Sequence, residues 1–191
     1  MNLAQLNWIC WGAFGLMWIA GAVYNFFKAP DTVMRRARRD WLIFAALVGL
    51  GLHYIPHHLL AFTRFHVAWL QAFGAILLVA STLYTLWSRR VLGQMWASNA
   101  AVKEGHHLVT NGPYKITRHP IYSGILGMIL GSALSLGQGS AFLVFLMAWI
   151  FFMNRIRNEE QLMAMAFGEQ YVQYKKRVPP LMPGFKRRDK Q

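Results

Sequence analysis

The sequence is poor in acidic residues and has almost no cysteine. Its 191 residues include 7 Asp and Glu against 20 Lys and Arg, and the one cysteine is Cys10. A single cysteine excludes an intramolecular disulfide framework, and a lone cysteine in an apolar run usually behaves as a small hydrophobic residue. Charged residues make up 14% of the chain and hydrophobic residues 55%, whereas a soluble domain carries about 25% charged residues. This composition indicates an integral membrane protein.

Several function classes lack their usual signals in this sequence. No glycine-rich dinucleotide-binding fingerprint is present, which argues against a soluble Rossmann-type fold. No nucleic-acid-binding motif accompanies the basic residues, so we expect no nucleic-acid partner. No charged residue lies deep in an apolar run and no broken helix pair repeats in two halves, so a transporter is not favoured. The N-terminus lacks the basic region of a cleavable signal peptide.

The apolar runs predict an all-α integral membrane helical bundle of about five spans. The expected spans cover residues 8–27, 41–62, 66–87, 120–136 and 140–153. The last two are short for a bilayer about 30 Å thick, which needs roughly 20 helical residues, so they are expected to form a short hairpin. Helical character continues to about Arg177 as an amphipathic helix at the membrane surface. We expect a single domain over 1–191, with three spans in 1–90 and a ligand-binding half in 91–185.

The basic residues predict the orientation of these spans. Every Lys and Arg except Arg64 falls on the same side of the predicted bundle. Positive charge near span ends marks the cytoplasmic side of a plasma or endomembrane. The N-terminus is therefore expected outside, and the polar segment and the C-terminus in the cytosol. The net charge of +13 then indicates topology, together with attraction to anionic membrane lipids.

One long polar stretch, residues 105–124, separates the two apolar halves of the chain. Asn111-Gly112-Pro113 predicts a turn, and Pro120 suits the first turn of the following helix. Arg118 and His119 are then expected at the mouth of that helix, beside free backbone N–H groups that suit an anionic or strongly polar ligand. We therefore predict that a cofactor head group binds here. The polar side chains gathered in the stretch are His106, His107, Tyr114, Arg118, His119 and Tyr122.

A second charged cluster follows the fifth span. Arg155 and Glu159 are four residues apart and share one helix face, whereas Arg157 and Glu160 are three apart on another. Ionisable groups at a membrane boundary are costly unless they pair or have a function, and two surface ion pairs are the simpler alternative. No metal site is expected: adjacent histidines such as His106 and His107 point apart, and the other histidines lack a nearby carboxylate or cysteine.

Two segments together resemble the isoprenylcysteine carboxyl methyltransferase family, whose wider clan includes phospholipid N-methyltransferases. They read HHLVTNGPYKITRHPIYSG and RNEEQLMAMAFGEQYVQYKKRVP, and the resemblance covers about residues 90–185. It implies a membrane enzyme that uses S-adenosylmethionine to methylate a lipophilic small molecule or lipidated group. It also implies that Arg155 holds the substrate and acts with Glu159 in catalysis. The cofactor contacts that it implies are His106, His107, Leu108, Val109, Tyr114, His119, Pro120, Tyr122 and Glu159.

The chemistry of the acceptor leaves alternatives open. A carboxylate is ionised at pH 7 and needs no general base, so carboxyl O-methylation of an isoprenylcysteine-type substrate is favoured. An amine or thiol would first lose a proton, and His119 or Glu159 could then act as base in phospholipid N-methylation or small-thiol S-methylation. A lipid-binding membrane scaffold is the non-enzymatic alternative. It explains the basic charge but not the cluster of His and Tyr at one helix mouth.

Overall fold

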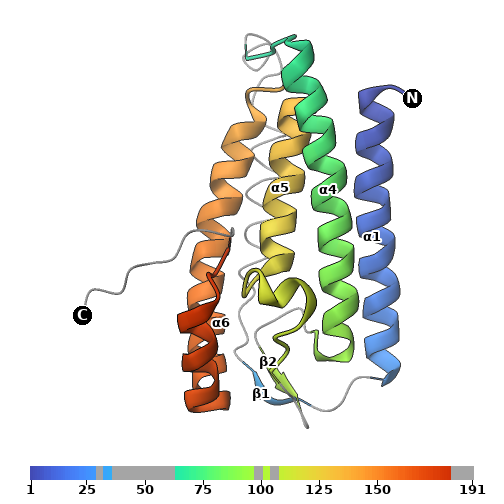
Figure 1. Cartoon of the computed structure of the whole chain (residues 1–191). Coiled ribbons are helices and arrows are strands. Elements are labelled where there is room, and N and C mark those ends of the chain that lie inside the picture. The colour runs from blue at the N-terminus through green and yellow to red at the C-terminus, as the bar shows by residue number, and fades with distance from the viewer. Residues whose placement is uncertain (29–31, 36–62, 97–100, 104–107, 182–191) are drawn as a thin grey trace, which may run out of the picture.

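The computed structural model describes residues 1–28, 32–35, 63–96, 101–103 and 108–181. Four helices lie side by side: α1 (Leu3–Lys28), α4 (Ala68–Leu92), α5 (Pro120–Ser135) and α6 (Ala141–Arg177). They follow the order α1, α4, α5, α6 across the bundle (Figure 1). Two short 3₁₀ helices, Gly93–Met95 and Gly112–Lys115, and two strands, β1 (Thr32–Arg35) and β2 (Ala101–Lys103), complete the described elements.

Three of these helices are long and apolar enough to cross a membrane, judged by length and composition. They are Leu3–Lys28, Ala68–Met95 and Ala141–Arg177, while Pro120–Ser135 is a shorter apolar helix. The predicted integral membrane helical bundle is thus confirmed. The predicted second span, residues 41–62, lies outside the described residues.

Helix α6 joins the predicted fifth span to the helical segment that the sequence analysis predicts up to about Arg177. It continues from Ala141 past Met153 to a kink at Gly168, where φ is 51° and the backbone is not helical, and a further helical segment reaches Arg177. No proline or glycine stands between Met153 and Gly168, so nothing local stops the helix before that glycine. Beyond the kink, the final turns fold back along the earlier part of α6 (Figure 1).

A small sheet near the ends of α1 and α4 was not predicted. Strand β1 pairs with β2 in antiparallel register, with Thr32 opposite Lys103 and Arg35 opposite Ala101. Strands of four and three residues are too short to give a period-2 pattern in the sequence. The sheet connects the chain after α1 to the chain before the polar stretch (Figure 1).

Small residues bring α5 and α4 into close contact. A methyl group added at Gly124 would overlap the hydroxyl of Thr85, and one at Gly127 would overlap that of Ser81. At Gly131 an added methyl would lie 2.6 Å from the backbone nitrogen of Leu78. Such glycines let membrane helices approach closely, as the sequence pattern indicates. This contact holds the start of α5 in place.

Replacing Gly127 with valine should therefore destabilise the bundle. The larger side chain would meet Ser81 directly, and overpacking of this kind costs about 1–3 kcal/mol. Thermal unfolding of the purified protein in detergent measures the effect. Gly12→Val is the matched control, because no atom lies within 4 Å of the position that its Cβ would take. Equal melting temperatures for Gly127→Val and the wild type would contradict the expected close contact.

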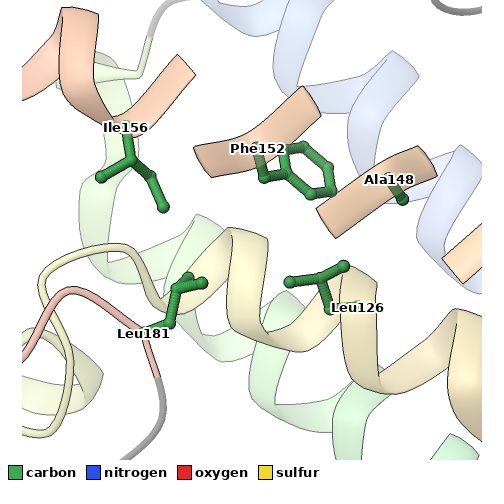
Figure 2. Packing of buried hydrophobic residues seen from close by; sticks show 5 residues of the cluster. All are labelled: Leu126, Ala148, Phe152, Ile156 and Leu181. Atoms are coloured by element: carbon green, nitrogen blue, oxygen red, sulfur yellow. The ribbon is translucent and has the colours of Figure 1, made fainter. Parts of the chain in front are cut away.

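A hydrophobic cluster joins α5, α6 and the segment that follows α6. Figure 2 shows Leu181 beside Leu126 of α5, facing the side chains of α6. The cluster fixes residues 178–181 against the bundle, near the start of α5. Its buried members are Leu126, Ala148, Phe152, Ile156 and Leu181.

Candidate functional site

The predicted turn at Asn111-Gly112-Pro113 opens the 3₁₀ helix Gly112–Lys115. Gly112 has a φ of 55°, a conformation that glycine adopts readily. The hydroxyl of Tyr174 donates to the carbonyl oxygen of Tyr114 at 2.6 Å. Tyr114 is itself buried, and this burial raises the pKa of its phenol above the ordinary value. The hydrogen bond from Tyr174 thus holds the turn against the end of α6. Because its pKa is raised, the phenol of Tyr114 is uncharged at neutral pH.

His119 lies at the mouth of α5, as the sequence predicts, and Pro120 occupies the first position of the helix. The imidazole is stacked on the ring of Tyr122, with centroids 5.7 Å apart and planes 6° apart. The other side of this stack is Phe152 of α6, whose ring centroid lies 4.7 Å from that of Tyr122. Two aromatic rings, Tyr122 of α5 and Phe152 of α6, therefore support the imidazole from one side.

The hydroxyl of Tyr122 connects the two charged residues that the sequence analysis selects on α6. It donates to Glu159 Oε1 at 2.5 Å and accepts from Arg155 Nε at 2.7 Å. Arg155 Nε also donates to Glu159 Oε1 at 3.0 Å. The predicted pairing of Arg155 with Glu159 is thus present, and a tyrosine from α5 fixes its geometry.

The imidazole of His119 lies between two carboxylates. Its Nδ1 is 3.6 Å from Glu159 Oε2, and its Nε2 is 3.6 Å from Glu160 Oε1. Both distances exceed that of a good hydrogen bond. Nε2 is buried and has no hydrogen-bond partner among the described residues. A buried polar atom without a partner is costly, so this position suits a ligand that completes the bonding.

Glu160 pairs with Arg118, and this corrects the predicted pair of Glu160 with Arg157. Arg118 Nε and Nη2 donate to Glu160 Oε1 at 2.8 and 2.5 Å, and Lys175 Nζ lies 3.0 Å from Glu160 Oε2. Arg157 is exposed. The fold brings Arg118 to Glu160 from 42 residues away, so helix spacing alone could not show the partner.

The backbone N–H groups of Arg118 and His119, at the predicted helix mouth, both donate to the segment that follows α6. Arg118 N donates to Pro179 O at 2.9 Å, and His119 N donates to Pro180 O at 3.0 Å. The Arg118 side chain also donates through Nη1 to the carbonyl oxygens of Lys175 (2.9 Å) and Val178. Residues 178–181, which we call the C-terminal strap, therefore lie across the mouth of α5. A ligand at this site meets side chains rather than these two N–H groups.

The remaining predicted site residues either have a position but no specific contact among the described residues, or lie outside the described part of the chain. Leu108 and Val109 are half-buried just before the turn. His106 and His107 lie outside the described residues. Residues 1–28, 32–35, 63–96, 101–103 and 108–181 contain no group of three His, Cys, Asp or Glu that could hold a metal ion. The sequence analysis missed Phe152, since one more aromatic residue in an apolar span carries no distinguishing signal.

The fold and the site define a helical integral membrane protein with a charged, aromatic-lined site formed by α5, α6 and the C-terminal strap. Its fold is similar to that of the eukaryotic intramembrane Ras methyltransferase ICMT, with a TM-score of 0.59 and 23% sequence identity. The similarity covers 80% of this chain and 55% of that one. The sequence model of the isoprenylcysteine carboxyl methyltransferase (ICMT) family matches residues 74–165. That segment is similar to this family, in agreement with the resemblance of the two motifs.

Curated relatives show the same similarity. The chain is 33% identical over 118 residues to protein-S-isoprenylcysteine O-methyltransferase B of Arabidopsis thaliana, which covers 60% of each chain. It is 39% identical over 110 residues to the Schizosaccharomyces pombe protein-S-isoprenylcysteine O-methyltransferase, covering 48% of this chain and 47% of that one. With the Mus musculus protein of the same name the identity is 32% over 123 residues, 63% of this chain and 44% of that one. The chain thus matches about half the length of these relatives.

Proposed function

We propose that the protein is an S-adenosylmethionine-dependent methyltransferase that esterifies the carboxylate of a lipophilic, isoprenylcysteine-like acceptor at the cytosolic membrane face. The observation that carries the proposal is the meeting of His119, Tyr122, Arg155 and Glu159 in one hydrogen-bonded and stacked cluster. The names of the curated relatives give the acceptor class. The basic residues of the sequence support the cytosolic side.

The residues present fit a cationic donor. The carboxylate of Glu159 lies beside Nδ1 of His119, and that of Glu160 lies beside its unpartnered Nε2. Arg118 and Lys175 both offset the charge of Glu160, whereas Glu159 pairs with Arg155. When Arg155 engages the acceptor carboxylate, Glu159 would be the carboxylate left to attract the donor. His119, Tyr122 and Glu159 would hold the donor, with Leu108 and Val109 beside it. When bound, S-adenosylmethionine supplies a methyl group on a positively charged sulfur.

The chain's own contribution is orientation and exclusion of water. Arg155 would hold the acceptor carboxylate through its guanidinium group, whose position is set by Tyr122 and Glu159. A carboxylate oxygen is already a nucleophile at neutral pH, so no proton has to be removed. The apolar cluster of α5, α6 and the C-terminal strap keeps water from one side of the site. Alignment and desolvation of this kind supply most of the acceleration that an in-line displacement needs.

Incubation of the purified protein with labelled S-adenosylmethionine tests the proposal. Three acceptors are compared: a prenylated cysteine with a free carboxylate, a lipophilic thiol and phosphatidylethanolamine. We expect label in a base-labile ester of the first acceptor, identified by mass analysis. Label in the thiol or the amine would favour the alternative acceptors. Binding of anionic vesicles with no transfer to any acceptor, and no donor binding, would favour the lipid-binding scaffold.

Tyr122→Phe should weaken the binding of both the methyl donor and the acceptor. The phenylalanine ring keeps the stack between His119 and Phe152, but the hydroxyl that joins Arg155 to Glu159 is lost. Hydrogen bonds to charged groups contribute about 1.5–3 kcal/mol, so kcat/KM should fall by roughly ten- to a hundredfold.

Steady-state kinetics with each substrate varied in turn measures this effect, and we expect the KM of the donor and that of the acceptor both to change. Tyr24→Phe is the control, since that hydroxyl contacts Gln94 and lies away from the site. A Tyr122→Phe enzyme with wild-type constants would show that the bridge has no role in catalysis.

A further inference from the structure

A second buried cation lies at the ends of α1 and α4, outside the candidate site. Arg89, in the last turn of α4, is only 4% exposed. Its Nη1 donates to the carbonyl oxygen of Gly93 at 3.0 Å, and its guanidinium carbon lies 4.4 Å from the ring centroid of Trp96. Its Nε and Nη2 are buried, and neither has a hydrogen-bond partner in the described part of the chain. A buried charge with unused donors is strongly unfavourable unless an anion meets it.

The two unused nitrogens define the kind of ligand. Nε and Nη2 lie on the same edge of the planar guanidinium group. Two parallel N–H groups on one edge match the spacing of two oxygen atoms in a phosphate or a carboxylate. The unbonded edge of Arg89, formed by Nε and Nη2, can thus bind an oxyanion through two hydrogen bonds.

A neighbouring acceptor is also without a partner. Asn25 of α1 donates through Nδ2 to the carbonyl oxygen of Trp96 at 3.0 Å, whereas its Oδ1 is buried and unbonded among the described residues. Asn25 stands four residues after Gly21 and so on the same face of α1. A ligand that satisfies both groups carries anionic oxygens for Arg89 and a hydroxyl for Asn25.

We call the place where these groups meet, between α1 and α4, the crevice. An added methyl at Gly21 would overlap Arg89 Nη2 and lie 2.9 Å from its guanidinium carbon, so the guanidinium lies directly against the backbone of α1. The buried residues of α1 are Asn7 and Cys10, both in its first half. The half of α1 that carries Gly21 contributes no buried residue, so displacing it to admit a headgroup would disturb little buried packing.

The position of Arg89 along the bundle indicates that the oxyanion belongs to a lipid headgroup. Helix α1 ends at Lys28 and α4 at Leu92, at the same end of the bundle (Figure 1). Lys28 and Arg90 are exposed there, and Trp18 and Trp96 stack edge to face at 5.8 Å. Tryptophan and basic residues at the ends of membrane helices lie at the level of lipid headgroups.

We propose that this crevice, formed by Gly21, Asn25, Arg89 and Trp96, binds the headgroup of an anionic phospholipid. Two phosphate oxygens accept from Nε and Nη2 of Arg89, and a headgroup hydroxyl donates to Asn25 Oδ1. A phosphatidylglycerol headgroup offers both functions. The proposal does not depend on the proposed activity.

Native mass spectrometry of the full chain, with defined lipids added to the detergent-purified protein, tests the proposal. We expect phosphatidylglycerol to be retained at least tenfold more strongly than phosphatidylcholine. Arg89→Gln should abolish the preference, whereas Arg90→Gln, which changes the exposed neighbour, should keep it. Equal retention of the two lipids, or an unchanged preference in Arg89→Gln, would overturn the proposal. Inorganic phosphate that displaces the lipid at equal concentration would assign the crevice to a free anion and overturn the lipid source.

Two further variants protect the test against misfolding of Arg89→Gln. Arg89→Lys keeps the charge but lacks the paired N–H edge, and we expect at least a severalfold loss of phosphatidylglycerol retention. Gly21→Ala should displace the guanidinium and lower retention, whereas Gly15→Ala, with no atom within 4 Å of the added carbon, should not. The melting temperature should rise with phosphatidylglycerol in the wild type, Arg90→Gln and Gly15→Ala, and should rise less in Arg89→Lys and Gly21→Ala. A lipid-dependent rise in Arg89→Lys and Gly21→Ala equal to that of the wild type would contradict the proposal.

Discussion

Glu159→Gln should lower kcat/KM by about a hundred- to a thousandfold and weaken binding of S-adenosylmethionine and its demethylated product. Glutamine has the same size as glutamate but no charge. The variant would therefore lose the carboxylate that lies 3.6 Å from His119 and accepts from Tyr122 and Arg155. It would also place an amide where two donors now converge, which disturbs the position of Arg155.

Titration calorimetry with the demethylated product and steady-state kinetics measure the two effects of this change. Glu169→Gln is a close control, because Glu169 is an exposed glutamate of the same helix and accepts only from Gln173 among the contacts that the structure describes. Donor affinity in Glu159→Gln equal to that of the wild type would remove Glu159 from the donor site.

Arg155→Met should act on the acceptor rather than the donor. A charge-assisted hydrogen bond contributes about 1.5–3 kcal/mol, so the KM of a carboxylate acceptor should rise by roughly ten- to a hundredfold. Product binding in the donor site should change much less. Methionine retains a long apolar side chain against Tyr122, which limits the loss of packing.

The exposed Arg157, two residues further along α6, provides the control Arg157→Met. The pair of variants also distinguishes the acceptor classes. An amine acceptor carries no negative charge for Arg155 to hold, so its KM should not rise in Arg155→Met. A donor affinity that falls as far as the acceptor affinity would show that Arg155 supports the whole site rather than the acceptor alone.

Local sequence signals predicted the helical spans and the first half of the site. Pro120 marked the start of α5, so His119 could be placed at its mouth, and a spacing of four residues paired Arg155 with Glu159. The same signals failed where the partner comes from far along the chain. Arg118 meets Glu160 and the strap at Pro179, segments 42 and about 60 residues away. Helix spacing contains no information about such contacts. It indicated Arg157 as the partner of Glu160, because the two residues are three apart.

Helix α6 shows what local patterns can and cannot predict. Hydrophobicity falls after Met153, the predicted end of the fifth span, and helical character was predicted to continue to about Arg177, where the helix ends. The kink at Gly168, where φ is 51°, was not predicted. The polar extension of α6 carries Glu159 and Glu160 on an unbroken helix, which gives both carboxylates a rigid support.

The C-terminal strap has a consequence for how the protein is made. The carbonyl groups of Pro179 and Pro180 hold Arg118 and His119, so the start of α5 acquires its final geometry after the strap has left the ribosome. Translation products that stop before Val178 would insert their helices into the membrane and still lack this closure. The order of synthesis thus delays assembly of the site until nearly the whole described chain is present.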